Sequence, residues 1–208
     1  MTYAISDIHG CYKQYIELLE KINFSDEDVL YVLGDAIDRG PEPIKVLQDI
    51  VGRKNVFFIV GNHETLMYRV EKAIINSQKR KKKLTKETKL EYEEWISDGG
   101  FFTDNYFWGL AEEEQQEILN FIENSPEYIE VECGGVKYRL VHGDKKNWDL
   151  GNNNICTIIG HTPTFFINGT GCDEVFIRDG IIAIDCGCSY KGKLAAFCLE
   201  TKEATYVK

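Results

Sequence analysis

The stretch VLYVLGDAIDRG, residues 29–40, joins an apolar run to a cluster of charged residues. Five apolar or aromatic residues run directly into Gly34. Asp35, Asp38 and Arg39 then place two carboxylates and a guanidinium just beyond that run. A short apolar run bounded by turn residues is typical of a buried strand. Because open α/β sheets bind ligands at the carboxyl ends of their strands, the stretch predicts a strand that ends at a functional site.

The same arrangement recurs around the histidines. The protein has four of them, and each lies just past a predicted strand, close to a glycine: His9, His63, His142 and His161. Glycine lets the backbone turn sharply and approach a ligand closely. A single histidine is usually a hydrogen-bonded core or surface residue, but that interpretation does not explain four of them at strand ends. All four are therefore candidate site residues.

Hydrophobic periodicity predicts the elements that carry these clusters. We expect strands at 3–6, 29–33, 56–60, 128–133, 136–141, 157–159, 174–178, 181–184, 194–199 and 204–207. We expect helices at 12–21, from 43 onward, and at 65–77, 87–96 and 112–123. The alternation in the first third implies a parallel sheet with right-handed crossovers. The sequence therefore predicts a single α/β domain over residues 1–208, with a helical insertion at about residues 65–125.

Composition disfavours several classes of function. The chain has 208 residues and a net charge of -10, whereas affinity for nucleic-acid backbones comes from Lys and Arg. No apolar run approaches the roughly 20 residues of a membrane helix, and no signal-peptide pattern follows Met1. Seven scattered cysteines without an export signal indicate a reducing compartment. We expect a cytoplasmic protein without nucleic-acid or membrane partners; its oligomeric state is open, with a monomer as one plausible state.

The donor types at the strand ends predict a metal site. Carboxylate, imidazole and amide oxygen suit Mn, Fe or Zn rather than a soft thiolate site. The candidate ligands are too many for one catalytic ion with an open position: Asp7, His9, Asp35, Asn62, His142 and His161. Two ions that share a bridging carboxylate fit better, and such pairs clamp the attacking and leaving oxygens of an in-line displacement. We expect two divalent ions, with manganese first and iron or zinc as alternatives.

Arg39 indicates the substrate. A metal pair attracts an anion, and a guanidinium beside it can bind phosphate oxygens bidentately. Hydrolysis of a phosphate ester also needs a proton for the leaving alkoxide. His63 could supply that proton, because a neighbouring carboxylate would orient the imidazole and raise its pKa. A phosphorylated protein or a small phosphoester is therefore the expected substrate.

Five motifs carry these residues between positions 6 and 163: SDIHG, GDAIDRG, GNHE, a later HG, and GHTP. In this order they resemble the signature of the phosphoprotein phosphatases, the metal-dependent serine/threonine phosphatases among the calcineurin-like metallophosphoesterases. The C-terminal stretch AIDCGCSYKGKLAAF is similar to the bacterial and phage members. The resemblance implies a calcineurin-like metallophosphoesterase fold, in which two mixed sheets form a β-sandwich flanked by helices.

The resemblance also implies a set of ligands for each metal ion. Asp7 and His9 would hold the first ion, and Asp35 would bridge both ions. The second ion would be held by one amide and two imidazoles, from Asn62, His142 and His161. The implied reaction is direct attack on phosphorus by a hydroxide that the two metals activate, with no phosphoenzyme.

The catalytic residues follow from the same resemblance. His63 would be the general acid, paired with Asp38, and Arg39 would bind the phosphate. Many relatives carry a second phosphate-binding arginine between the last two metal-binding histidines, but here that span has none. Lys145 and Lys146 are the candidate substitutes, acting as point charges. The candidate substrate-binding residues are therefore Arg39, Asn62, Lys145 and Lys146.

Two other functions are compatible with parts of this pattern. A dinucleoside polyphosphate hydrolase, similar to the diadenosine tetraphosphatases, would need a base pocket, for which residues 101–108 are the first candidate. That aromatic stretch is otherwise expected to pack inside the helical insertion. A catalytically silent binding module would lack a ligand or the proton donor, whereas this chain has every one. Glu64 is expected to be a first-turn helix carboxylate, and Tyr190 a packing residue.

Overall fold

A computed structural model describes residues 1–143, 155–167, 169 and 171–208. Three adjacent strands of its first sheet are parallel: β1 (Thr2–Ile5), β2 (Val29–Leu33) and β3 (Val56–Ile59). Helices α1 (Tyr12–Lys21) and α2 (Pro43–Gly52) connect them. The β-α-β-α-β order is the predicted one. The turns that follow the three strands therefore meet at one edge of the sheet.

Antiparallel strands complete the first sheet, in the order β10-β9-β1-β2-β3. β9 (Leu194–Cys198) pairs with β1, and β10 (Ala204–Val207) pairs with β9. The second sheet has the order β4-β5-β6-β8-β7 and is also mixed. Its strands are β4 (Tyr128–Cys133), β5 (Val136–Val141), β6 (Ile155–Ile159), β7 (Phe176–Arg178) and β8 (Ile181–Ala183).

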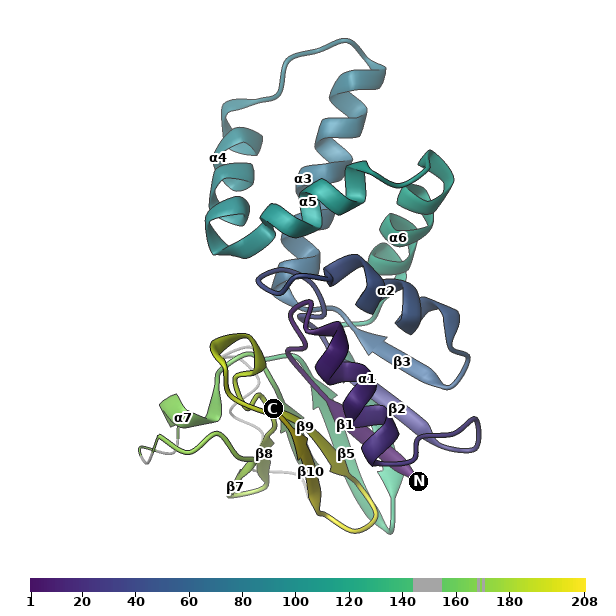
Figure 1. The fold of residues 1–208 in the computed structure, drawn as a ribbon, viewed down its shortest axis with the longest axis vertical. Coiled ribbons are helices and arrows are strands. Elements are labelled where there is room, and N and C mark those ends of the chain that lie inside the picture. The colour runs from purple at the N-terminus through teal and green to yellow at the C-terminus, as the bar shows by residue number, and fades with distance from the viewer. Residues whose placement is uncertain (144–154, 168, 170) are drawn as a thin grey trace.

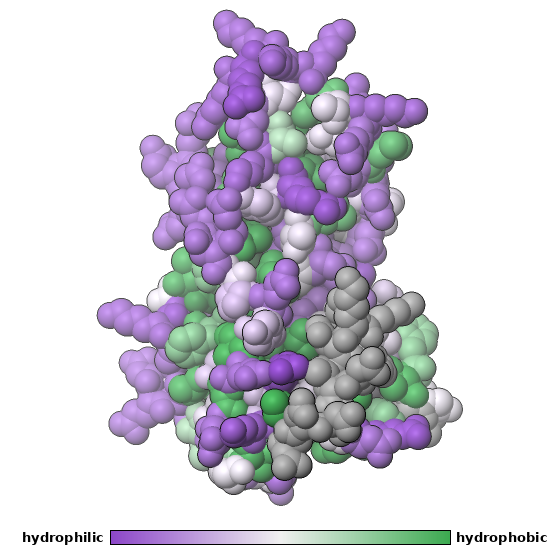
Figure 2. Space-filling view, turned by 180° about the vertical axis from the view of Figure 1, so that it is seen from behind, coloured by the Kyte–Doolittle hydropathy of each residue, from purple (hydrophilic) through white to green (hydrophobic). Residues whose placement is uncertain are grey.

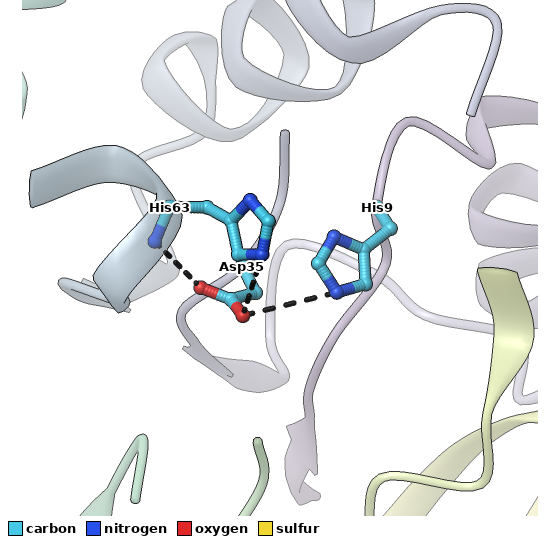
Figure 3. A group of neighbouring side chains, drawn as sticks. All are labelled: His9, Asp35 and His63. Carbon is cyan, nitrogen blue, oxygen red and sulfur yellow. Dashed lines mark hydrogen bonds and ion pairs between the residues drawn. The ribbon is translucent and has the colours of Figure 1, made fainter. Parts of the chain in front are cut away.

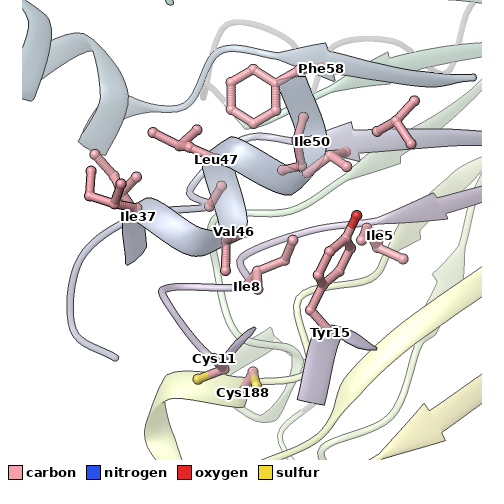
Figure 4. Packing of buried hydrophobic residues seen from close by; sticks show 14 of the residues in the cluster. Ile5, Ile8, Cys11, Tyr15, Ile37, Val46, Leu47, Ile50, Phe58 and Cys188 are labelled. Carbon is pink, nitrogen blue, oxygen red and sulfur yellow. The ribbon is translucent and has the colours of Figure 1, made fainter. Parts of the chain in front are cut away.

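Two hydrophobic layers hold this architecture together. One lies between the sheets, where Leu33 and Phe197 from the first sheet share a buried cluster with Leu140 from the second. The other lies between the first sheet and its helices, where Tyr15 and Leu47 are fully buried (Figure 4). Each such side chain contributes about 1.5–3 kcal/mol when it leaves water. The two layers confirm the predicted sandwich of mixed sheets flanked by helices.

Four helices follow β3 and extend beyond the sheets on the side of α2 (Figure 1). They are α3 (Asn62–Lys79), α4 (Lys86–Trp95), α5 (Phe101–Trp108) and α6 (Glu112–Asn124). Hydrophilic side chains cover most of this end of the molecule in Figure 2. The helices occupy the region of the expected insertion; that they belong to a single domain stays a prediction. Among the helices described, none is both long and apolar enough to span a bilayer.

Three local expectations were wrong. Helix α3 begins at Asn62 rather than at residue 65, so the GNHE motif forms its first turn. The stretch at 101–108 is a helix with only one face in the core: Phe107 is fully buried, whereas Phe101 and Tyr106 are more than half exposed. Between α4 and α5, a π-helical turn over Ile96–Gly100 kinks the chain instead of ending the helix in a loop. A further short helix, α7, spans Thr164–Ile167.

Candidate active site

Asp35, just past the end of β2, lies at the centre of the histidine cluster. Its Oδ2 is 3.8 Å from His9 Nε2, 3.9 Å from His63 Nε2 and 3.3 Å from His142 Nε2. Figure 3 shows the rings of His9 and His63 directed toward this carboxylate. His161 joins Asp35 and His142 in a second group whose potential ligand atoms all lie within 4.8 Å of one another. Asp35 is thus common to two groups that could each hold a metal ion.

The backbone around the site adopts an uncommon conformation. Six of the predicted site residues have a positive φ: Asp7, His9, Asp35, Asp38, Arg39 and His161. For residues other than glycine this conformation costs about 1–3 kcal/mol each, and it persists where the surrounding structure imposes it. The loops after the strands are therefore held in place by their contacts, which is typical of pre-organised functional sites.

Hydrogen bonds fix two of the imidazoles in the form that a metal ligand needs. His9 Nδ1 donates to the Ile37 carbonyl at 2.9 Å, and His142 Nδ1 donates to the Leu33 carbonyl at 2.7 Å. Metal-binding histidines commonly donate one ring N–H to such a partner, which leaves the other nitrogen for the ion. In both residues the remaining Nε2 faces Asp35. Asn62 Oδ1 is 2.9 Å from His142 Nε2 and so reaches the same place.

The carboxylates of the site are suited to a cation. Burial raises the pKa of Asp7 to about 7, and Asp7 Oδ1 has no hydrogen-bond partner among the described residues. That oxygen is 3.9 Å from His9 Nε2. Burial alone would raise the pKa of Asp35, but the imidazoles of His142, His63 and His9 together outweigh it and lower that pKa. Asp7 thus offers a buried oxygen without a hydrogen-bond partner, close to imidazole nitrogens and to the ionised carboxylate of Asp35. Such a set of oxygen and nitrogen atoms suits divalent metal ions.

Glu64 does more than the expected first-turn carboxylate. Its side chain is fully buried and accepts four backbone N–H groups. Its Oε2 accepts from Asp35 at 2.9 Å and Gly61 at 3.0 Å, and its Oε1 accepts from Ala36 at 2.8 Å and Ile37 at 3.2 Å. The carboxylate thus joins the loops after β2 and β3, which carry Asp35 and Asn62. The sequence offered one signal for this role, namely a glutamate three residues after a helix cap.

Replacing Glu64 with glutamine is expected to destabilise the fold by roughly 2–5 kcal/mol, since each buried donor that loses its acceptor costs about 1–3 kcal/mol. The amide nitrogen of glutamine would face two of the four N–H groups. Urea unfolding of the metal-free protein measures the change. Glu114→Gln is the matched control, because Glu114 accepts one N–H, from Ala111, at the exposed start of α6. Equal losses for both variants would contradict a special role for Glu64.

Asp38 and His63 form a buried pair beside these groups. His63 Nδ1 donates to Asp38 Oδ2 at 2.6 Å, and both side chains are almost entirely buried. Burial by itself lowers the pKa of His63, but the hydrogen bond to Asp38 and the charge of Asp35 outweigh it and raise that pKa. The pair can therefore hold a proton on an imidazole whose Nε2 faces Asp35 and Arg39.

Arg39 lies between the site and the helical insertion. Its guanidinium nitrogens are 2.9 Å from His9 Nε2, 3.0 Å from His63 Nε2 and 3.2 Å from Asp98 Oδ1. The ring of Tyr190 lies 5.4 Å from the guanidinium carbon and is 54% exposed. Tyr190 therefore borders the site, and it also packs against Phe165 as expected.

The structure brings together every predicted site residue that it describes. Lys145 and Lys146 lie outside the described residues. Sequence reasoning missed three residues of the insertion that contact the predicted pair and arginine: Trp95, Asp98 and Thr103. The adjacent glycines at 99 and 100 were the available signal of a close backbone approach, but they were interpreted as the end of a helix.

Residues 2–192 match the family model of the calcineurin-like phosphoesterases, and the chain belongs to this family. The members of this family are metallophosphoesterases, which use divalent metals. The family prediction from the five motifs is confirmed.

Curated relatives bear two different names. The chain is 30% identical over 146 residues to serine/threonine-protein phosphatase 2 of Salmonella typhimurium, covering 68% of this chain and 57% of that protein. It is 41% identical over 80 residues to the symmetrical bis(5'-nucleosyl)-tetraphosphatase of Buchnera aphidicola, covering 38% of this chain and 29% of that protein. The matches thus span less than two thirds of these relatives.

Solved structures share the fold over nearly the whole chain. A candidate diadenosine tetraphosphatase has a TM-score of 0.65 at 15% identity, with 99% of this chain and 92% of that chain covered. A protein serine/threonine phosphatase from Saccharomyces cerevisiae has a TM-score of 0.60 at 12% identity, with 100% and 79% covered. At these identities the likeness shows the fold alone, and it agrees with the predicted fold class.

Proposed function

We propose that this protein hydrolyses phosphomonoesters and that its substrates are phosphoserine and phosphothreonine in proteins. One observation carries the proposal: a buried Asp38–His63 pair presents an imidazole nitrogen 3.0 Å from the guanidinium of Arg39. A proton donor and an anion-binding group thus lie side by side, next to the two potential metal groups. Hydrolysis of an alkyl phosphate requires this combination, because its leaving group is a strongly basic alkoxide that needs a proton.

The proposed metal ligands are those that the family resemblance implies, and the positions of the described side chains support them. Asp7 and His9 would hold the first ion and Asp35 both ions, and the second ion would be held by Asn62, His142 and His161. When bound, a pair of divalent ions supplies an activated water and offsets the charge of the phosphate. Manganese is the proposed metal, with iron or zinc as alternatives, since carboxylate and imidazole ligands suit all three.

The protein's own residues then have separate tasks. Arg39 binds phosphoryl oxygens through its planar guanidinium, which can donate two parallel hydrogen bonds. His63 would carry a proton on Nε2 for the leaving oxygen once the Arg39 guanidinium, which can only donate to that nitrogen, has turned to the phosphate. Asp38 accepts the N–H at Nδ1, which keeps the ring oriented and stabilises its protonated form. No serine or cysteine nucleophile has a part in this mechanism.

The leaving group separates the two functions named among the relatives. Cleavage of a dinucleoside polyphosphate releases a nucleotide phosphate, which is a much weaker base than an alkoxide and gains less from protonation. The buried acid pair therefore favours the monoester. The longer match, over 68% of this chain, is also to the relative named a serine/threonine phosphatase.

Dinucleoside polyphosphate hydrolysis is the second candidate, and Tyr190 favours it. An exposed aromatic ring 5.4 Å from the phosphate-binding guanidinium is placed where a nucleotide base could stack. The tyrosine ring also packs edge-on against Phe165, with ring centroids 6.2 Å apart, which would hold the stacking surface in place.

A substrate comparison tests the proposal. The metal-free protein is loaded with Mn²⁺, and phosphate release is measured from a phosphoserine peptide, a phosphotyrosine peptide and diadenosine tetraphosphate. p-Nitrophenyl phosphate reports whether the metal site is active. We expect the phosphoserine peptide to have the highest kcat/KM of the three, by at least about tenfold, or about 1.4 kcal/mol in transition-state stabilisation. Preference for the dinucleotide would establish the second candidate instead.

A further inference from the structure

We infer that Trp95 and Thr103, two residues of the helical insertion, position the Asp38–His63 pair for proton transfer. The inference rests on the proposed function, because it concerns the same proton donor. It gives the insertion a part in the chemistry, although its helices lie outside the β-sandwich (Figure 1). Neither residue touches the reacting atoms; both act through Asp38.

The two residues complete the hydrogen bonding of the Asp38 carboxylate. Asp38 Oδ2 accepts from His63 Nδ1 at 2.6 Å and from the indole Nε1 of Trp95 at 2.9 Å. Asp38 Oδ1 accepts from the hydroxyl of Thr103. That hydroxyl in turn accepts the backbone N–H of Asp38 at 3.1 Å. Asp38, Trp95 and Thr103 are each fully buried, so these donors stand in place of water.

This arrangement fixes the direction of the Asp38 carboxylate. A buried carboxylate is costly unless hydrogen bonds satisfy it, and hydrogen bonds to a charged group contribute about 1.5–3 kcal/mol each. With Oδ1 held by Thr103 and Oδ2 by Trp95, Asp38 can face His63 in only one orientation. The His63 ring is then held with Nδ1 toward Asp38 and Nε2 toward the site. Loss of either donor would let the pair turn away from that alignment.

The kink between α4 and α5 makes these contacts possible. Gly99 has a φ of 107°, and its carbonyl accepts the Arg39 N–H at 2.9 Å. A Cβ on Gly99 would lie 2.7 Å from Arg39 Cγ, and one on Gly100 would lie 2.5 Å from Trp95 Nε1. The two glycines therefore allow the π-helical turn to lie directly against the Asp38–Arg39 turn, with Trp95 and Thr103 on either side of it.

Trp95 is also a large core residue, so the test must separate positioning from packing. A positioning role predicts losses that depend on the leaving group, because only a basic leaving group needs the proton from His63. A purely structural role predicts similar losses on every substrate. The two substrates are a phosphoserine peptide, with an alkoxide leaving group, and p-nitrophenyl phosphate, whose leaving group is weakly basic.

The experiment uses Trp95→Phe, which keeps an aromatic ring but removes the N–H, and Thr103→Val, which keeps the shape but removes the hydroxyl. For each, kcat on the phosphoserine peptide is expected to fall by roughly tenfold or more with KM nearly unchanged, the scale of losing one hydrogen bond to a charged group. Turnover of p-nitrophenyl phosphate should fall by less than about threefold. Thr103→Ser, which restores the hydroxyl, should recover most of the loss.

Two control variants show which part of the inference is wrong if the expected losses are not found. Trp108→Phe makes the same chemical change on α5, away from Asp38, and should leave both activities unchanged. His63→Asn is the reference for complete loss of the acid. His63→Asn should lower turnover of the peptide more than turnover of p-nitrophenyl phosphate. If it does so, but Trp95→Phe and Thr103→Val either lose the same activity on both substrates or lose none, the positioning role is wrong. If His63→Asn itself fails to discriminate, the proton-donor assignment is wrong and the inference falls with it.

Discussion

Replacing His63 with asparagine is expected to lower kcat on a phosphoserine peptide by about 10²–10⁴-fold, the usual contribution of a positioned general acid. Asparagine retains a polar side chain of similar reach but has no titratable proton for the leaving oxygen. The Asp38 contact at 2.6 Å would become an ordinary amide hydrogen bond. Steady-state kinetics with the Mn²⁺-loaded enzyme measures the change.

The same variant has a built-in control. His63 is not among the proposed metal ligands, so the bound metal, measured by elemental analysis, should not change. Turnover of p-nitrophenyl phosphate should fall much less than turnover of the peptide, because its leaving group needs little protonation. Unchanged peptide turnover at full metal content would remove His63 from the acid role. If the variant lost metal together with activity, His63 would instead be a metal ligand. Its position in one potential metal group with His9 and Asp35 allows that role.

Replacing Asp35 with asparagine is expected to have the largest effect on metal binding. Its Oδ2 lies within 3.9 Å of three histidine nitrogens, and Asp35 belongs to both potential metal groups. An amide of the same shape lacks the negative charge that two cations would share. We expect the affinity for Mn²⁺ to fall by at least about 100-fold. Mutating a residue that only hydrogen-bonds to a metal ligand usually lowers metal affinity by about 10–100-fold. Titration calorimetry measures it.

Asp179→Asn is the matched control for this variant. Asp179 is a carboxylate on the exposed β7–β8 turn, with 83% of its side chain accessible, and it is remote from the histidine cluster. The exchange removes the same charge from the protein and should leave Mn²⁺ affinity unchanged. If the Asp35→Asn variant bound two Mn²⁺ ions with normal affinity, Asp35 would not be a ligand shared by both ions.

Much of the fold could be predicted from local patterns. The bounds of α1, β2, β4, β5 and β10 agree with the sequence-based ranges because their apolar residues recur with a clear period. Residues 101–108 have no such period: Phe101 and Phe102 are exposed and Phe107 is buried, so the apolar residues lie on several sides of α5. The start of α3 was missed because Asn62 and His63 were interpreted as loop residues at a strand end, whereas they also form the first helical turn.

The site was predictable to the extent that it lies at strand ends. Asp7 and Asp35 each lie two residues past adjacent parallel strands of the first sheet, so the topology of that sheet brings them together. His142 follows β5 of the second sheet and reaches them because the two sheets pack against each other. Trp95 and Thr103 reach Asp38 from 57 and 65 residues further along the chain, through one and two side-chain hydrogen bonds respectively. A local pattern contains no information about such a contact. Only the three-dimensional arrangement of the insertion shows that it takes part in the site.

The strand order of the first sheet has a consequence for biosynthesis. β1, which leads into Asp7 and His9, is held between β2 and β9, and β9 is formed by Leu194–Cys198. One edge of this strand therefore stays unpaired until those residues have emerged from the ribosome. Pairings between distant parts of a chain form late, because the loop between them must first close. The loop that carries Asp7 and His9 should thus become rigid only after Leu194–Cys198 has been synthesised and has paired with β1.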